Sequence, residues 1–328
     1  MEFKNIQSIF SISNSDEFET QCLRIFDFQF SQNPVYKSYC ELLGKNPKNI
    51  SDSSEIPFLP IEFFKSKEIV SFTKPVEVIF ESSGTTGSTT SKHFIPDLNI
   101  YRESFTKAFT LFLGAPEKYC ILALLPSYLE RKGSSLVFMV DDLIHQSQHP
   151  DSGFYLYDVQ QLHQKLIELE EKATKTLLIG VSFALLDLAE QYPMNLKHTK
   201  IMETGGMKGR RKEMIREELH YHLKKAFGTD AVYSEYGMTE LLSQAYSLGK
   251  GTFDCPPWMK VLTRDTEDPL SPQDYGKTGG INIIDLANVY SCSFIATQDL
   301  GKVYPDGSFE VLGRFDHSDV RGCNLMAL

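Results

Sequence analysis

A segment rich in glycine and hydroxyl side chains is the first place in this chain where chemistry could occur. It has the sequence SSGTTGSTTSK, runs from Ser82 to Lys92, and follows the apolar, β-branched segment VEVIFE (76–81). Glycine lets a backbone bend and approach a ligand closely, and successive N–H groups in such a turn form a concave anion site. The segment therefore favours the phosphates of a nucleotide, although a solvated surface loop would have the same composition.

The end of this segment separates it from better-known phosphate loops. It lacks the Gly-Lys-Ser/Thr ending of a Walker A loop. Lys92 can neutralise phosphate charge, and His93 beside it either contacts a phosphate or acyl carbonyl or is an ordinary loop histidine. The residues expected to contact phosphate are Ser82, Ser83, Gly84, Thr85, Thr86 and Gly87.

A second candidate is the segment Tyr236-Gly237-Met238-Thr239-Glu240, which follows the apolar sequence AVYSE. A tyrosine ring can stack on a purine, and a threonine hydroxyl can reach a phosphate. A glutamate at this spacing can hold Mg²⁺, which prefers carboxylate and phosphate oxygens. A strand-to-loop junction with a packed tyrosine would have the same sequence.

Two further charged residues lie in the last third of the chain. Asp299, in the sequence TQDLG, could accept hydrogen bonds from both hydroxyls of a ribose. Arg314, in the sequence GRFD, could reach a ribose or a phosphate. Taken singly, a turn aspartate and a surface hairpin with a charge pair explain them equally well.

Composition excludes several classes of protein. The 328 residues are 41% hydrophobic and 23% charged, which is ordinary for a globular chain of one large domain or two to three small ones. The formal net charge of −10 disfavours binding to nucleic-acid phosphates or to an anionic membrane surface.

Cysteine usage and the N-terminus indicate where the protein would work. The six cysteines form no C-x-x-C pair, so structural zinc is not expected, and their scatter fits reduced cytosolic thiols. The start MEFKNIQSIFSIS is not a secretory signal, and no run of 18 apolar residues exists. We expect a soluble, cytoplasmic protein.

Short apolar runs must position the candidate residues. The runs VEVIFE, KYCILALLP (118–126), SSLVFMVDDLI (134–144) and KTLLIGV (175–181) predict strands, and the segment 159–175 predicts a helix. Apolar strands that alternate with helices predict an α/β fold with a mostly parallel sheet covered on both faces. We expect an N-terminal helical segment over 1–75, an α/β nucleotide-binding core over 76–250, and a β-rich subdomain over 251–328 with a turn at Pro305-Asp306-Gly307.

In this order and spacing, the four motifs resemble those of the adenylate-forming superfamily, which includes acyl-CoA synthetases, luciferases and nonribosomal adenylation domains. SSGTTG…K resembles its phosphate loop and YGMTE its adenine and Mg²⁺ motif. TQDLG resembles its ribose-binding motif, with Gln298 where glycine is usual, and GRFDHSDVRG resembles its hinge motif. METGGMKGR (202–210) falls where the family has a glycine-rich loop that contacts adenine, which implies Gly205 and Gly206 as further contacts. The resemblance implies ATP and Mg²⁺ as cofactors, with Glu240 as metal ligand and Lys92 and Glu240 in catalytic roles.

A narrower resemblance is to the acyl-protein synthetase of the bacterial luminescence fatty-acid reductase complex. It rests on ESSGTTGSTTSKH, on LLPSYLERKGSSLVFMVDDLI (124–144) and on the terminal RGCNLMAL. Ordinary superfamily members continue after the hinge motif into a C-terminal lid domain, and the resemblance implies a member without that lid. It also implies activation of a fatty acid as acyl-AMP, transfer to an enzyme cysteine, and transfer to a partner such as a reductase or carrier protein.

Cys323 is the candidate for that cysteine. It follows Gly322, which permits close approach, and Arg321, which favours the thiolate. The alternative is an inert C-terminal cysteine packed as a small hydrophobic residue. The other five cysteines lie in apolar or ordinary contexts and are expected to be structural.

Two other functions remain open at this level. RGCN also resembles the Arg-Gly-Val-Asn of phenylacetate-CoA ligases, which would make the chain an acyl-CoA synthetase. A relative that binds a nucleotide without turnover would keep the same motifs. A serine hydrolase is not expected, because GSSLV is not a G-x-S-x-G elbow. His220 and His222 lie two residues apart on a helix, so a solvated helix surface is expected there in place of a metal site.

Overall fold

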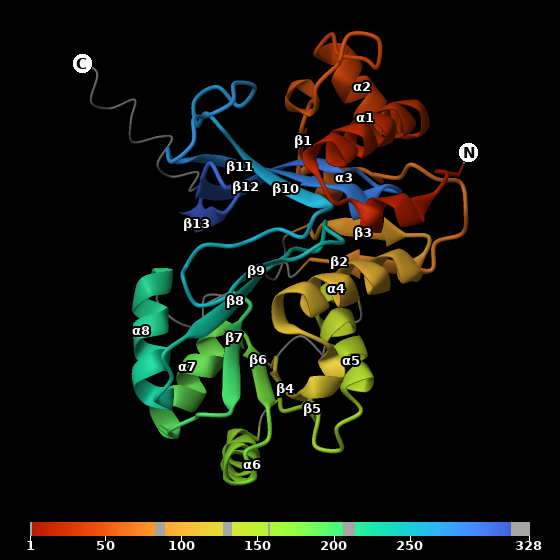
Figure 1. Ribbon diagram of the computed structural model, residues 1–328. Helices are drawn as coiled ribbons and strands as arrows, with labels where there is room; N and C mark the ends of the chain where they lie inside the picture. Colours follow the sequence, from red (N-terminus) through yellow and green to blue (C-terminus); the bar gives the residue numbers. More distant parts are fainter. Residues whose placement is uncertain (1, 83–88, 127–132, 157, 206–213, 316–328) are drawn as a thin grey trace, which may run out of the picture.

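The computed structural model describes residues 2–82, 89–126, 133–156, 158–205 and 214–315. Within them, two sheets with their helices lie on either side of a two-stranded hairpin, which Figure 1 shows near the middle of the molecule. A six-stranded sheet forms the lower part of that view, and a five-stranded sheet beneath the N-terminal helices forms the upper part.

The elements have the following bounds. The α-helices are α1 (Ser15–Gln32), α2 (Pro34–Leu42), α3 (Phe63–Ser66), α4 (Leu98–Leu113), α5 (Ser135–Ser147), α6 (Val159–Glu171), α7 (Ser182–Gln191) and α8 (Arg216–Phe227). The 3₁₀ turns are η1 (Ile6–Ser11), η2 (Ser53–Glu55), η3 (Pro116–Lys118) and η4 (Leu286–Asn288). The strands are β1 (Leu59–Pro60), β2 (Val78–Glu81), β3 (Lys92–Ile95), β4 (Cys120–Leu124), β5 (Gly153–Phe154), β6 (Thr176–Gly180), β7 (Thr199–Glu203), β8 (Val232–Tyr236), β9 (Ala245–Ser247), β10 (Met259–Arg264), β11 (Gly279–Asp285), β12 (Phe294–Val303) and β13 (Phe309–Arg314).

The two N-terminal helices begin at asparagine caps. Asn14 accepts the N–H of Glu17 at 2.9 Å and starts α1. Asn33 ends α1 and starts α2 by accepting the N–H of Tyr36 at 3.0 Å, and Pro34 follows it, where no intrahelical N–H is needed. The helices predicted in this region are therefore present, and they cover the five-stranded sheet (Figure 1).

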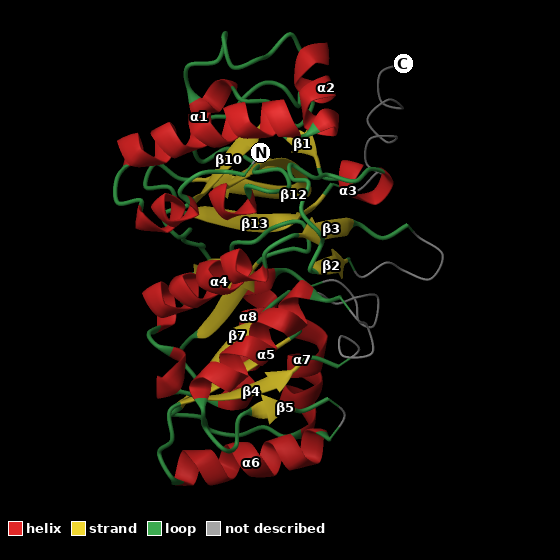
Figure 2. Cartoon of the chain, turned by 90° about the vertical axis from the view of Figure 1, so that its right-hand side faces the viewer, coloured by secondary structure: helices red, strands yellow, loops and turns green. Residues whose placement is uncertain are grey.

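The six-stranded sheet has the order β5-β4-β6-β7-β8-β9 and is parallel except for β9. Its central strands β4 and β6 are buried throughout, which explains their continuous apolar sequences. Helices α4 and α5 lie on one side of the sheet and α7 and α8 on the other (Figures 1 and 2). The predicted parallel sheet covered on both faces is confirmed.

One of the predicted strands is a helix. The run SSLVFMVDDLI forms most of α5, which Ser134 caps by accepting the N–H of Val137 at 3.3 Å. The buried residues Met139, Val140 and Leu143 recur at helical spacing, so the run has one apolar face that a strand pattern does not require. The prediction of a strand was wrong because the buried residues of this run recur at the period of a helix and not at that of a strand.

The five-stranded sheet joins distant parts of the chain. β11 pairs with β10 and β12, β13 pairs with β12, and the short β1 from the N-terminal region pairs in parallel with β12. Asp306 forms the predicted turn before β13 by accepting the N–H of Ser308 at 3.0 Å, with Gly307 at φ 86. None of the helices in the described part of the chain has the length and apolar character needed to cross a bilayer.

Candidate functional site

The hairpin β2–β3 carries both ends of the glycine-rich segment. The Ser82 N–H donates to the Ser91 carbonyl at 3.1 Å, and the Ser91 N–H donates to the Ser82 Oγ at 2.8 Å. These two hydrogen bonds join the two ends of the glycine-rich segment. Lys92 begins β3 opposite Glu81, with Nζ 4.0 Å from the Glu81 carboxylate and half of its side chain exposed. The predicted phosphate contacts Ser83, Gly84, Thr85, Thr86 and Gly87 lie outside the described residues.

The fold brings Glu240 to this hairpin. Glu240 is buried at 6% exposure, and burial raises the pKa of its carboxyl, opposed by a hydrogen bond from Ser91 and by the charges of Arg314 and Lys65. The end of the glycine-rich segment and the YGMTE segment, far apart in sequence, thus meet at the pair Ser91–Glu240.

Three buried side chains, those of His93, Asp285 and Asn288, hold the backbone around Glu240. The His93 Nδ1 lies 2.8 Å from the Thr239 carbonyl, and Asn288 Nδ2 donates to the Glu240 carbonyl at 2.7 Å. Asp285 accepts the N–H groups of Leu242 at 2.7 Å and Ser243 at 3.1 Å. These hydrogen bonds hold the backbone on both sides of Glu240 against the buried core.

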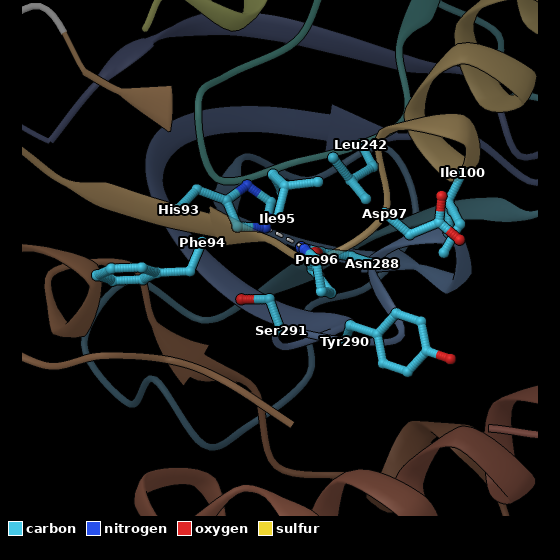
Figure 3. Close-up of a pocket in the computed structure, with 11 residues that line it drawn as sticks. His93, Phe94, Ile95, Pro96, Asp97, Ile100, Leu242, Asn288, Tyr290 and Ser291 are labelled. Atoms are coloured by element: carbon cyan, nitrogen blue, oxygen red, sulfur yellow. Dashed lines mark hydrogen bonds between the residues drawn. The ribbon is translucent and has the colours of Figure 1, made fainter. Parts of the chain in front are cut away.

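His93 takes neither of the two roles expected from the sequence. It is fully buried, and Figure 3 shows its ring directed at Asn288, with Nε2 2.9 Å from Oδ1. Burial lowers the pKa of His93 to about 4, while the hydrogen bonds to the Thr239 carbonyl and the Asn288 side-chain oxygen favour the charged form, because both ring nitrogens face oxygens that accept. The cavity beside this pair has a volume of about 10 Å³, which leaves room for about one water and no ligand.

Replacing Asp285 by Ala is expected to lower the free energy of unfolding by about 3 kcal/mol, because it leaves buried N–H groups of the Glu240 loop without an acceptor. Burial raises the pKa of Asp285 to about 6, while the hydrogen bonds from Ser243, Leu242 and Ala287 favour the charged form. Denaturant unfolding would measure the difference. The control is Asp274→Ala, which removes an exposed ion pair with Lys277 and should change the free energy of unfolding little. Equal losses of stability in the two variants would show that the hydrogen bonds from Asp285 do not hold the Glu240 loop.

Tyr236, Asp299 and Arg314 form one hydrogen-bonded unit. The Tyr236 hydroxyl donates to Asp299 Oδ2 at 2.7 Å, and Arg314 Nε donates to Asp299 Oδ1 at 3.1 Å. Asp299 and Arg314 face each other across β12 and β13, and Tyr236 reaches them from the end of β8. The Arg314 side chain is 80% exposed, so its guanidinium retains donors for a ligand.

The Tyr236 ring is itself packed. It lies 5.5 Å from the ring of Phe309 and 5.8 Å from that of Phe253. Burial and the Asp299 charge raise the pKa of Tyr236 well above its usual range, which keeps its hydroxyl a donor. The sequence suggested the ring of this tyrosine as a purine platform; the structure adds its role as the donor that orients Asp299.

Gly205 and the end of β7 lie beside the end of β8, because the two strands are parallel neighbours. Gly205 has φ 74, a left-handed conformation that favours glycine, and its N–H donates to Glu203 at 2.6 Å. Burial opposes ionisation of Glu203, but His220, Arg216 and the Gly205 N–H outweigh it and lower the pKa of Glu203 to about 2. The predicted partner Gly206 lies outside the described residues.

The two histidines of α8 differ in burial. His220 is buried against Ser234 and Glu203, so the prediction of a solvated helix surface was wrong for it, whereas His222 is exposed.

The other predicted site residues are placed as follows. Gly237 and Thr239 lie in the loop that leads to Glu240, and the Thr239 carbonyl is hydrogen-bonded to His93. Cys323 lies outside the described residues.

The described cysteines are poor nucleophiles. Burial raises the pKa of Cys40 to about 12 and that of Cys120 to about 11, and it raises the pKa values of Cys22, Cys255 and Cys292 further. A thiolate is the reactive form, so these thiols are inert near pH 7. Four of the five are buried and Cys255 is half-buried, which agrees with the prediction that they are structural.

A magnesium ion fits the donors present if a nucleotide completes its shell. In the described ranges, no three His, Cys, Asp or Glu side chains gather into a metal cage. Mg²⁺ commonly takes one or two carboxylates and fills its remaining positions with water and phosphate oxygens. The buried Glu240 carboxylate, beside Ser91 at the end of the glycine-rich segment, would supply one such ligand.

Comparison with known proteins identifies the fold. No protein-family model matches the chain, and no curated protein matches it in sequence. The structure is similar to that of 2-hydroxyisobutyryl-CoA ligase in complex with 2-HIB-AMP and CoA, with TM-score 0.70 and 14% identity over 92% of this chain and 68% of that one. ATP-bound MatB from Rhodopseudomonas palustris gives TM-score 0.53 and 18% identity over 73% of this chain. An ATP-bound chimera of RpMatB and BxBclM gives TM-score 0.55 and 19% identity over 73% of this chain.

The chain spans about half the length of these two MatB structures, 48% in each case. At these identities the comparison establishes the fold. The α/β architecture of the N-terminal part of adenylate-forming ligases, expected from the motifs, is confirmed.

Proposed function

We propose that this chain is an ATP-dependent adenylate-forming ligase that activates a fatty acid or related carboxylic acid as acyl-AMP and acts as an acyl-protein synthetase. The observation that carries the proposal is the convergence of separate motifs at one edge of the six-stranded sheet. The Ser91 hydroxyl hydrogen-bonds Glu240 there, Lys92 follows Ser91 at the start of β3, and Tyr236 hydrogen-bonds Asp299, which also binds Arg314. Ligands of α/β sheets bind at the carboxyl ends of the strands, and Tyr236 is the last residue of β8.

Each group has a task that its position supports. Asp299, held by Tyr236 and Arg314, would accept the two ribose hydroxyls, and Gly205 would border the adenine. Lys92 and the N–H groups of the glycine-rich segment would stabilise charge on the phosphates. Mg²⁺, held by Glu240 and phosphate oxygens, would supply positive charge where negative charge builds up.

The first step follows from the chemistry of carboxylic acids. A carboxylate is a poor acyl donor, because its leaving group would be oxide. Its oxygen attacks the α-phosphorus of ATP, the bond from that phosphorus to the bridging oxygen breaks, and pyrophosphate leaves. The protein's contribution is to orient the two reactants and to stabilise the developing charge.

In the second step a thiolate attacks the acyl carbonyl, the bond to the phosphate oxygen breaks, and AMP leaves with its electron pair. Cys323 is the proposed nucleophile, after loss of its thiol proton. Support comes from the other cysteines, which burial keeps protonated. A partner protein, a reductase or an acyl carrier, would then take the acyl group by thioester exchange.

Intact-mass analysis tests this proposal without CoA. The wild-type protein incubated with Mg·ATP and a fatty-acid series is expected to gain the mass of one acyl group, because Cys323 retains it as a thioester. Cys323→Ser should release pyrophosphate but gain no mass, and the control Cys255→Ser should behave as wild type.

Other outcomes separate the alternatives. Pyrophosphate release with no adduct on either protein would remove Cys323 from the reaction. It would favour a CoA ligase or a separate acyl carrier. ATP binding without pyrophosphate release would contradict ligase activity and indicate a nucleotide-binding relative.

A further inference from the structure

A buried carboxylate at the end of β7 gathers partners from three elements around the proposed nucleotide site. Glu203 is the last residue of β7, and its side chain is 2% exposed. Its Oε2 accepts the Gly205 N–H at 2.6 Å and the Ser182 hydroxyl at 3.3 Å. Its Oε1 lies 3.3 Å from Arg216 Nε and 3.6 Å from His220 Nε2, both on α8. One carboxylate therefore holds the residue after β7, the start of α7 and the first turns of α8.

Gly205 is held from both sides by these contacts. Its N–H binds Glu203, and its carbonyl accepts the N–H of Ser182 at 3.4 Å. The Thr204 N–H before it donates to the Gly180 carbonyl at 3.0 Å. Glycine can adopt many backbone conformations, so the hydrogen bonds to Glu203 and Ser182 select the left-handed one, φ 74, that Gly205 has here.

Arg216 connects the same carboxylate to the five-stranded sheet. Its Nη1 donates at 3.0 Å to the carbonyl of Val311 in β13, three residues before Arg314. Its guanidinium carbon lies 4.7 Å from the centre of the Phe253 ring, a cation–π contact. Phe253 in turn exchanges backbone hydrogen bonds of 2.7 and 3.0 Å with Phe309 of β13. Arg216 thus bridges α8, in the lower part of Figure 1, and β13, in the upper part.

The two ends of this connection lie on the two sides of the proposed nucleotide site. Gly205 is the residue assigned to adenine, and β13 carries Arg314, which binds the ribose acceptor Asp299. Adenine and ribose are joined by one bond, so their contacts must stand at a fixed separation, and a shift of about 1 Å would weaken binding strongly.

The chemistry of the pair suits such a role. A buried ion pair is often no more stabilising than an apolar pair of the same volume, so stability alone does not account for Glu203 and Arg216. Arginine presents several donors in one planar group, whereas a lysine ammonium is a point charge on a flexible stem. The planar group lets Arg216 bind Glu203 and the Val311 carbonyl at the same time.

We propose that Glu203 and Arg216 are positioning residues, which set the adenine side of the nucleotide site at the correct distance from its ribose side. This rests on the proposed function, which assigns Gly205 to adenine and Asp299 to ribose. Neither residue of the pair needs to touch the nucleotide. Glu203 acts through the backbone of Gly205, and Arg216 acts through the backbone of β13.

Titration with ATP in the absence of acid tests the inference without turnover. Glu203→Gln removes the charge that holds Arg216, and Arg216→Met removes the donors. Each should weaken ATP binding by about 10-fold, the lower end of the loss found for orienting partners at metal sites. The double variant should lose little more than either single variant, because each change breaks the same connection.

Arg216→Lys separates positioning from stability. It keeps the positive charge beside Glu203, so its melting temperature should stay closer to that of the wild type than the melting temperature of Arg216→Met does. It lacks the planar group that reaches both partners, so it should bind ATP as weakly as Arg216→Met. Lysine that restored both the melting temperature and ATP binding would make the pair a stabilising ion pair only and overturn the inference.

The matched control is Lys165→Met on α6, at the far end of the six-stranded sheet from β13 (Figure 1). Lys165 is 22% exposed, close to the 21% of Arg216, and it pairs with Asp151 at 2.8 Å and Glu168 at 2.9 Å. This variant should lose stability but bind ATP as the wild type does. An equal loss of ATP binding in this control would indicate general destabilisation and overturn the inference.

The remaining outcomes distinguish this inference from the proposed function. If the wild type binds ATP and the Glu203 and Arg216 variants bind it equally well, the positioning role is wrong and the ligase proposal stands. If the wild type binds no ATP, the proposed function itself is wrong, and the inference fails with it.

Discussion

Replacing Glu240 by Gln is expected to lower pyrophosphate release by about 10²–10³-fold, the range seen when one preorganised electrostatic group is removed from an active site. Glutamine has the same shape and keeps an oxygen for the hydrogen bond from Ser91, so the loop held by His93, Asn288 and Asp285 should remain in place. What is lost is the negative charge that would hold Mg²⁺ beside the phosphates. Initial rates at saturating ATP and acid would measure the effect.

A matched control is Glu217→Gln, which removes an exposed carboxylate in the first turn of α8. It should leave both the rate and the melting temperature nearly unchanged. The wild-type rate should also increase with pH through a value above the ordinary glutamate pKa, because burial raises the pKa of Glu240 and the ionised form is the active one. A Glu240→Gln protein with the wild-type rate would remove this carboxylate from the reaction.

Replacing Asp299 by Asn is expected to weaken ATP binding by about 100-fold, because each of several hydrogen bonds to a charged group contributes about 1.5–3 kcal/mol. Asn offers one oxygen where Asp299 now accepts from both the Tyr236 hydroxyl and Arg314 Nε, so one donor loses its partner and the ribose loses its acceptor. Titration with ATP in the absence of acid would measure the change directly.

The controls for Asp299 separate a nucleotide effect from a folding effect. Asp306→Asn alters an exposed turn aspartate between β12 and β13 and should bind ATP as the wild type does. Tyr236→Phe removes only the donor that orients Asp299, so its loss should be smaller. If Asp299→Asn bound ATP normally but lost affinity for the acid, the assignment of this unit to ribose would be wrong.

Much of the fold could be predicted from the chain. The runs that form β4 and β6 are apolar at every position, which is the pattern of strands buried on both faces, and asparagine before each N-terminal helix supplies a cap. The failure at α5 shows the limit. A short apolar run fits a buried strand or a buried helix, and only its period separates the two.

The candidate site could be predicted in part. Lys92, Glu240, Tyr236, Asp299 and Arg314 stand in local motifs whose residue types suit a nucleotide, and the structure brings the last three into one hydrogen-bonded unit. The roles of the residues that hold the Glu240 loop were missed. His93 binds Asn288 from 195 positions away, and Asp285 and Asn288 are 43 and 48 positions from the groups they hold around Glu240. No local pattern marks such partners.

By itself, the sequence determined which elements form and which side chains could bind a nucleotide, because helical caps, strand burial and motif composition act between neighbours in the chain. Only the tertiary structure decided which polar groups are buried, which of them are paired, and on which face of β8 each one lies. Glu203 and Glu235 illustrate this: both are buried glutamates at strand ends, yet the pKa of one is lowered to about 2 and that of the other raised to about 8. The physical reason is that a charge is stabilised or opposed by its surroundings in space, and those surroundings come from segments far apart in the chain.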